Sequence, residues 1–238
     1  MANTYQFGLP LIQPAQAQKH VTVNEAVARL DAVAQLRVVS TIVATPPATA
    51  LDGECYVVPS GATGDWAGRA GEVAVYSNGG WVFLSPKTGW RGWDESSGTE
   101  IVHDGSAWVQ ASVIGPGGAA TALRIVELDH VLAGGGAAEA TAALIPSHAQ
   151  VIGVTARVVA DITGSGVSSW SLGVSGDPAR YASGLGLTKN SWARGLSGAP
   201  VTYYADTALE ITADAGSFTA GTIRLAAHVV ELTPPRAV

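Results

Sequence analysis

Two stretches of the chain align without a gap: GEVAVYSNGGWV (residues 71–82) and GTEIVHDGSAWV (residues 98–109). Each begins with glycine, continues as a short apolar strand, passes through a glycine-containing turn and ends in Trp-Val. This order of residues is typical of a β-hairpin. The sequence therefore predicts a repeated hairpin, and DGECYV (residues 52–57) has the opening of a degenerate third copy.

Tryptophan is concentrated around this repeat, since five of the seven tryptophans lie between Trp66 and Trp108. Two explanations are open: aromatic rings that stack on sugars at a surface, or large side chains that fill a small sheet. Trp81 and Trp108 end strands of the repeat, so we expect both in the core.

Composition indicates an all-β protein with a weakly charged surface. The 238 residues include 29 Gly and 12 Pro, and only 13% are charged, against the usual share of about 25%. Because so few charges leave wide, weakly polar areas on a monomer, we expect a homo-oligomer. The formal net charge of −6, with no two Lys or Arg residues adjacent, argues against nucleic acid as a partner.

The sequence predicts no secretion signal, membrane span or metal site. Residues 1–6 lack the features of a signal peptide, and no apolar run reaches the roughly 18 residues of a membrane span. The five histidines show no metal-binding spacing, and Cys55 is expected to be a buried, inert thiol. We therefore expect a protein made in the cytoplasm, without a cofactor and without membrane insertion.

Residues 1–48 are predicted to form an N-terminal arm and a helix. Residues 3–17 carry no charge and are expected to be extended. TVNE (residues 22–25) resembles a capping box that opens a helix, which Pro46-Pro47 would end, and Glu25 and Arg29 have the spacing of a favourable pair. The helix is apolar over more than one stripe. It either packs on its own domain or bundles with its copies through Val23, Val27, Leu30, Ala34 and Val38.

Two β domains are predicted to follow. Residues 49–113 form a small Trp-rich β-repeat domain, residues 114–122 a glycine-rich linker, and residues 123–238 a distal β-sandwich or jelly roll of six to eight strands. Residues 151–162 alternate in polarity. One face of this strand carries Ile152, Val154, Ala156, Val158, Ala160 and Ile162, and Arg157 lies on the opposite face.

Side chains suited to binding sugar are better represented than side chains suited to catalysis. The sequence has no Gly-x-Ser-x-Gly elbow and no spacing that pairs carboxylates as a glycosidase requires, so we expect no enzyme. Aromatic faces hold pyranose rings, while Asp, Asn and Arg bond the hydroxyl groups. The carbohydrate-binding candidates are Trp66, Trp90, Trp93, Asp177, Arg180, Tyr181, Trp192 and Arg194, with Asn190 beside Trp192.

Several motifs carry a resemblance to a family. AQKHVTVNEA (residues 17–26), RLD (29–31) and GATGDWAG (61–68), through Trp81 and Trp90, resemble a domain of unknown function in phage-like fibre proteins of alphaproteobacteria. The family includes the head spikes and head fibres of gene transfer agents. GVSGD (173–177) and HVVELTPP (228–235) are similar to the domain that often follows it.

The resemblance implies a protein on the surface of a virion or gene-transfer-agent particle that adheres to the capsular polysaccharide of a recipient cell. It also implies attachment to a capsid or spike-base protein through the N-terminal arm, and a homo-oligomer, for which trimers are usual. Three functions remain open: a glycan-binding fibre, a purely structural adaptor with buried tryptophans, and a polysaccharide depolymerase.

Overall fold

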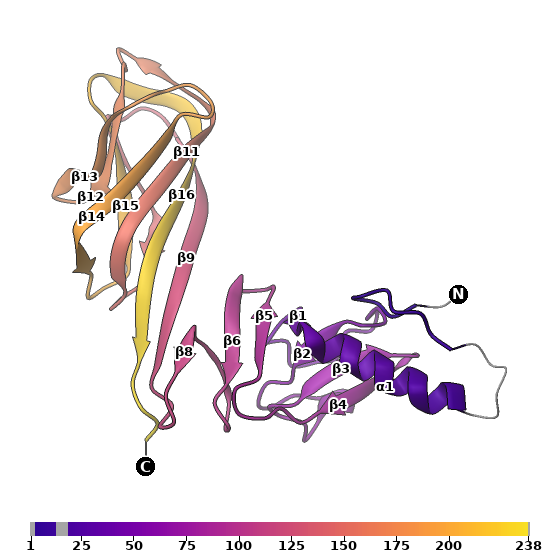
Figure 1. Ribbon diagram of the computed structural model, residues 1–238. Coiled ribbons are helices and arrows are strands. Elements are labelled where there is room, and N and C mark those ends of the chain that lie inside the picture. Colours follow the sequence, from indigo (N-terminus) through magenta and orange to yellow (C-terminus); the bar gives the residue numbers. More distant parts are fainter. Residues whose placement is uncertain (1–2, 13–18, 238) are drawn as a thin grey trace. The chain divides into compact units, whose positions relative to one another are not determined.

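The computed structural model describes residues 3–12 and 19–237, without the side chains of residues 19–21 (Figure 1). The chain divides into two compact units, residues 1–120 with 234–238, and residues 121–233. The boundary falls within the stretch 114–122 that the sequence predicts as a linker. Strands outnumber helices in both units, which confirms the predicted mostly-β fold class.

The first unit combines a helix with short strands. Its elements are α1 (Lys19–Ala34), β1 (Arg37–Val38), β2 (Cys55–Val57), the 3-10 helix η1 (Gly64–Trp66), β3 (Val73–Ser77), β4 (Gly80–Leu84), β5 (Arg91–Asp94), β6 (Thr99–His103), β7 (Trp108–Gln110) and β8 (Val113–Ile114). The sheet orders are β2-β3-β4 and β1-β5-β6-β7. The doubled sequence forms the hairpins β3–β4 and β6–β7, as predicted.

The two hairpins share one register. Tyr76 pairs with Trp81 across the first hairpin, and His103 pairs with Trp108 across the second. The ring centroids of these pairs are 5.0 Å and 5.3 Å apart. The repeat therefore places equivalent aromatic pairs, and such cross-strand pairs stabilise a sheet.

Residues 36–40 run between the two sheets and join them. On one side the Trp93 N–H donates to the Leu36 carbonyl, and on the other the Val39 N–H donates to the Cys55 carbonyl, both at 2.8 Å. Val38 lies between these contacts and is fully buried. It belongs to strand β1, so its predicted place on an oligomerising helix stripe is wrong.

The helix begins and ends earlier than predicted. Because α1 begins at Lys19, Thr22 lies within the helix and does not open it as the capping-box pattern predicted. The helix ends at Ala34, well before Pro46, since the next residues pair as β1. The local pattern could not show this, because the pairing partner of β1 is far away in sequence.

The N-terminal arm folds back on α1 and is anchored by a buried carboxylate. Asp31 Oδ1 accepts hydrogen bonds from the Thr4 hydroxyl at 2.7 Å and the Phe7 N–H at 2.9 Å, and Oδ2 accepts from the Gln6 N–H at 2.8 Å. Residues 3–12 are thus compact rather than extended. The rest of the predicted arm lies outside the described residues.

The second unit, residues 121–233, is described throughout and contains eight strands. They are β9 (Ala120–Val131), β10 (Ala138–Ile145), β11 (Gln150–Ser165), β12 (Trp170–Val174), β13 (Asp177–Leu185), β14 (Trp192–Thr202), β15 (Thr207–Ala213) and β16 (Ser217–Thr233). They pair as a nested set, β9 with β16, β10 with β15, β11 with β14 and β12 with β13. The result is two sheets, β10-β15-β12-β13 and β14-β11-β16-β9, which is a jelly roll.

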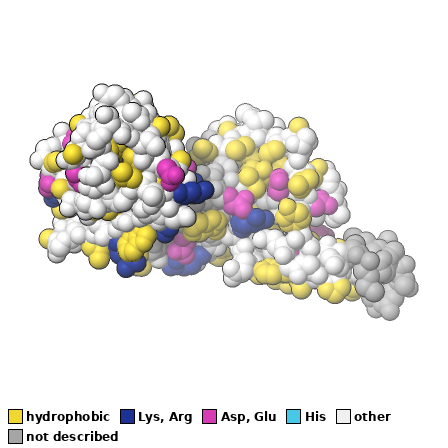
Figure 2. Space-filling model, turned by 90° about the horizontal axis from the view of Figure 1, so that it is seen from above, with side chains coloured by type: hydrophobic (Ala, Val, Ile, Leu, Met, Phe, Trp, Pro, Cys, Tyr) yellow, Lys and Arg dark blue, Asp and Glu magenta, His cyan; other side chains and the backbone are white. Residues whose placement is uncertain are grey.

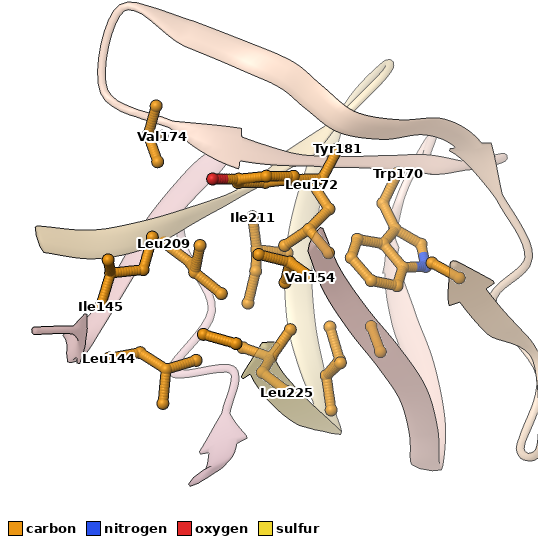
Figure 3. Close-up of a cluster of buried hydrophobic side chains, with 14 of the residues drawn as sticks. Leu144, Ile145, Val154, Trp170, Leu172, Val174, Tyr181, Leu209, Ile211 and Leu225 are labelled. Carbon is orange, nitrogen blue, oxygen red and sulfur yellow. The ribbon is translucent and has the colours of Figure 1, made fainter. Parts of the chain in front are cut away.

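The core of this unit lies between its two sheets (Figure 3). Val154, Leu172, Ile211 and Leu225, one from each of β11, β12, β15 and β16, are fully buried there. Register shifts in β11 at 151/153 and 158/160 alter the predicted alternation. Ile152, predicted on the core face, is 39% exposed, because a bulge inserts an extra residue and turns the side chain outward. Ala160 is exposed beside the second shift.

The turn between β15 and β16 holds Asp214, whose carboxylate accepts hydrogen bonds from two serine hydroxyls. Hydrogen bonds from the Ser169 and Ser171 hydroxyls lower the pKa of Asp214 below its ordinary value of 3.8, against a smaller opposing effect of desolvation. A carboxyl with a lowered folded-state pKa adds stability above its unfolded pKa and loses it as the pH falls. We expect the unfolding free energy to fall once the pH drops below the unfolded-state pKa of Asp214. In Asp214→Asn this fall should be smaller, which urea titrations from neutral pH to about pH 3 measure. An equal slope in the variant would contradict this.

Candidate functional site

The outer face of β14 carries an exposed tryptophan. Side chains alternate along a strand, and Ala193 and Gly195 are buried on the inner face while Trp192 and Arg194 point outward. Trp192 is 59% exposed. The strand therefore anchors itself in the core with one face and presents an indole ring with the other.

The neighbouring strand β11 adds a second arginine beside the ring. Strand pairing places Arg157 directly opposite Trp192 and Thr155 opposite Arg194. The Arg194 Cζ atom lies 5.5 Å from the Trp192 ring centroid, and Arg157 Nη1 donates to the Asn190 carbonyl at 3.2 Å. We call Trp192, Arg194, Arg157 and Asn190 the Trp192 face.

The turn before β14 holds this face in place. Asn190 has a φ of 74°, its N–H donates to the Val158 carbonyl, and the Val158 N–H donates back to the Ser191 carbonyl. The Lys189 N–H also donates to Asp161 Oδ1 at 2.6 Å. These bonds fix the conformation of the turn, so that a ligand of this face would not have to order it.

The chemistry of the Trp192 face suits a sugar. An exposed indole offers a flat apolar surface for a pyranose ring, and guanidinium groups donate hydrogen bonds to its oxygens. In Figure 2 most surface side chains are uncharged, and hydrophobic side chains lie next to basic ones.

The structure separates the other second-unit candidates from this face. Asp177 and Arg180 lie on β13, in the other sheet, and pair with each other at 3.1 Å. Tyr181 is wrong as a binding residue, because its ring lies within the core (Figure 3). Burial, reinforced by a 3.0 Å contact with the Tyr203 hydroxyl, raises the pKa of Tyr181.

The candidate tryptophans of the first unit differ in burial. Trp66 is fully buried in η1 between Tyr56 and Trp81, so its predicted role in stacking on sugar is wrong. The glycine-rich sequence around Trp66 predicted a loop with an exposed ring, but η1 places the ring in the core. Trp90 is half-buried, and Trp93 is 49% exposed on β5.

The outer face of α1 is apolar and unpaired among the described residues. Val23 is 41% exposed and Leu30 is 62% exposed, Ala34 is exposed, and Val27 is half-buried. A hollow of about 370 Å³ lies beside the helix, lined by Ala26, Arg29, Leu30, Val33, Leu84 and Trp90. The predicted pair Glu25–Arg29 is present at 2.5 Å.

Arg157 is the residue of the Trp192 face that sequence reasoning missed. The alternation of residues 151–162 placed it outward, but nothing local showed that β11 would pair with β14. From residues close together in sequence, only Trp192, Arg194 and Asn190 could be predicted for this face.

Metal-ligand clusters and membrane-spanning helices are both absent from the described residues. Their side chains form no group of three or more His, Cys, Asp or Glu that could hold a metal ion. None of their helices is both long and apolar enough to cross a membrane. Cys55 is buried as predicted, and burial, offset in part by Arg37, raises the pKa of its thiol to about 12.

Comparison with known proteins gives a match to a family and matches to solved structures. A search of curated proteins found no match. One solved structure, the cyanophage Pam1 capsid asymmetric unit, is 21% identical with a TM-score of 0.35, over 54% of this chain and 95% of that chain. Residues 23–109, which span most of α1 and both hairpins, match the family described as "Protein of unknown function (DUF2793)", as the resemblance to a domain of unknown function predicted.

Proposed function

We propose that the chain is a head spike or fibre on a phage or gene-transfer-agent particle and that its second unit binds recipient-cell capsular polysaccharide through the Trp192 face. One observation carries the proposal: Trp192 is 59% exposed on a sheet whose opposite face is core, with Arg194 and Arg157 beside it. The motif resemblance to phage-like fibre proteins and the jelly-roll topology, which capsid and lectin domains use, support it.

The stacking role predicts a large effect of Trp192→Ala on binding. A sugar ring that covers roughly 60 Å² of the indole contributes about 1.5 kcal/mol, so we expect about tenfold weaker binding of capsular polysaccharide. Biolayer interferometry with purified capsule and flow cytometry with recipient cells measure this. Trp93→Ala, which removes an exposed tryptophan from the first unit, is the matched control and should bind normally.

Equal binding by both variants and the wild type would favour the structural adaptor instead. That alternative has its own support, since β9 exposes a row of aliphatic side chains, Leu123, Ile125 and Val131, each more than half exposed. New reducing ends released from the capsule would identify a depolymerase; we propose binding without cleavage.

We propose further that copies of the chain associate through the outer face of α1, with the N-terminal arm on the particle side. Val23, Ala26, Leu30 and Val33 recur at alternating spacings of three and four residues, the pattern of helices that pack on one another. We expect Leu30→Asp to yield monomers in multi-angle light scattering. Leu51→Asp, also at an exposed leucine of the first unit, should leave the oligomer intact, and an unchanged mass for Leu30→Asp would refute the interface.

A further inference from the structure

We infer that the Trp192 face selects an acidic polysaccharide and binds the carboxylate of a hexuronic acid residue. This inference rests on the proposed glycan-binding function and adds the chemical class of the sugar. The arginines of the second unit divide into three that pair with carboxylates and two that, among the described residues, do not.

Three arginines of this unit are neutralised by carboxylates. Arg124 pairs with Glu231 at 2.9 Å, Arg180 with Asp177 at 3.1 Å, and Arg224 with Asp129 at 2.7 Å. The remaining two, Arg157 and Arg194, have no carboxylate within ion-pair distance among the described residues. Both of them flank Trp192.

The contacts of these two arginines hold their positions without cancelling their charge. Arg157 donates to the Asn190 carbonyl, and Arg194 lies against the Trp192 ring. A carbonyl and an indole face are neutral partners, so two positive charges stay beside one exposed ring in a chain whose net charge is −6. Arg224, opposite Arg157 on β16, shows the contrast, because Asp129 binds it with both oxygens.

The spacing fits a ring that carries one carboxylate. Arg157 is directly across from Trp192 on the adjacent strand, about 5 Å away between Cα atoms, and Arg194 is two residues along the strand, about 7 Å away. A pyranose stacked on the indole brings its C5 carboxylate within reach of either guanidinium. The planar guanidinium fork matches a carboxylate in two parallel hydrogen bonds.

Calorimetric titration of the full chain with galacturonate, mannuronate and glucuronate oligosaccharides tests this inference. Each is compared with the same oligosaccharide after reduction of its carboxyl groups to alcohols. We expect at least one uronate to bind about tenfold more tightly than its reduced form, and Arg157→Gln and Arg194→Gln each to remove about tenfold of the uronate affinity. Arg180→Gln, on the other sheet, is the control and should bind like the wild type.

The outcomes separate this inference from the proposed function. Equal affinity for uronates and reduced forms, unaffected by the two variants, would overturn acid selectivity and leave glycan binding in place. Binding of neither form, together with unchanged capsule adhesion by Trp192→Ala, would overturn both. Loss of affinity for the reduced form in Arg157→Gln would show that this arginine only supports the fold of the face, and would also contradict the inference.

Discussion

Replacing Trp66 with alanine is expected to lower the unfolding free energy of the first unit by about 4 kcal/mol, the usual cost of removing a large aromatic side chain from a core. Trp66 is fully buried, and its ring centroid lies 5.3 Å from that of Tyr56 and 5.0 Å from that of Trp81. The variant leaves a cavity at the centre of this cluster. Urea unfolding followed by near-ultraviolet circular dichroism measures the loss.

Trp192→Ala is the matched control for this measurement, because it removes the same side chain from an exposed position. We expect its unfolding free energy to stay within about 0.5 kcal/mol of the wild type. The transition of the second unit should also be unchanged in Trp66→Ala, since the two units are separately compact. Equal losses in both variants would contradict the assignment of Trp66 to the core and Trp192 to the surface.

Asp31→Ala is expected to release the N-terminal arm and to cost about 2–3 kcal/mol, because three donors lose their buried acceptor. The carboxylate binds Thr4, Gln6 and Phe7 together. Faster amide hydrogen exchange at Gln6 and Phe7, and chymotryptic cleavage beside Phe7, report the release. Asp52→Ala, at an exposed aspartate of the same unit, is the control and should leave hydrogen exchange and cleavage unchanged. If Asp31→Ala also left both unchanged, the arm would be held by other contacts and the prediction would be contradicted.

The sequence could predict the hairpins because their information is local. Asn78 and Gly79 both take positive φ in the first turn, and Gly105 does so in the second. Residues of these types at those positions are what tight hairpin turns require. The alternating strands of the second unit were visible for the same reason, and their number pointed to a sandwich or jelly roll.

The parts that sequence reasoning missed depend on distant partners. Strand β10 is rich in alanine and has no strong alternation, so only its pairing with β15 shows where it lies in the sheet. β1 looked like the end of a helix, because its pairing with β5 involves residues more than fifty positions away. The burial of Trp66 and the outward turn of Ile152 likewise follow from packing and from a bulge, which the local pattern does not record.

The candidate site could be predicted only in part, because some of its residues are neighbours in sequence and others meet only through strand pairing. Trp192, Arg194 and Asn190 are neighbours in sequence, so their cluster could be predicted. Tyr181 looked equivalent beside Asp177 and Arg180, but its ring is buried in the core while Asp177 and Arg180 are exposed. Arg157 reaches Trp192 only through the pairing of β11 with β14.

Oxidative footprinting of each tryptophan in the assembled protein, with and without saturating capsular polysaccharide, tests the role of the Trp192 face most directly. Mass spectrometry should find Trp192 reactive in the free protein and protected by polysaccharide, Trp93 reactive under both conditions, and Trp66 unreactive throughout. A Trp192 that is already protected in the free oligomer, or that remains fully reactive with polysaccharide bound, would contradict the proposal that this face recognises the sugar.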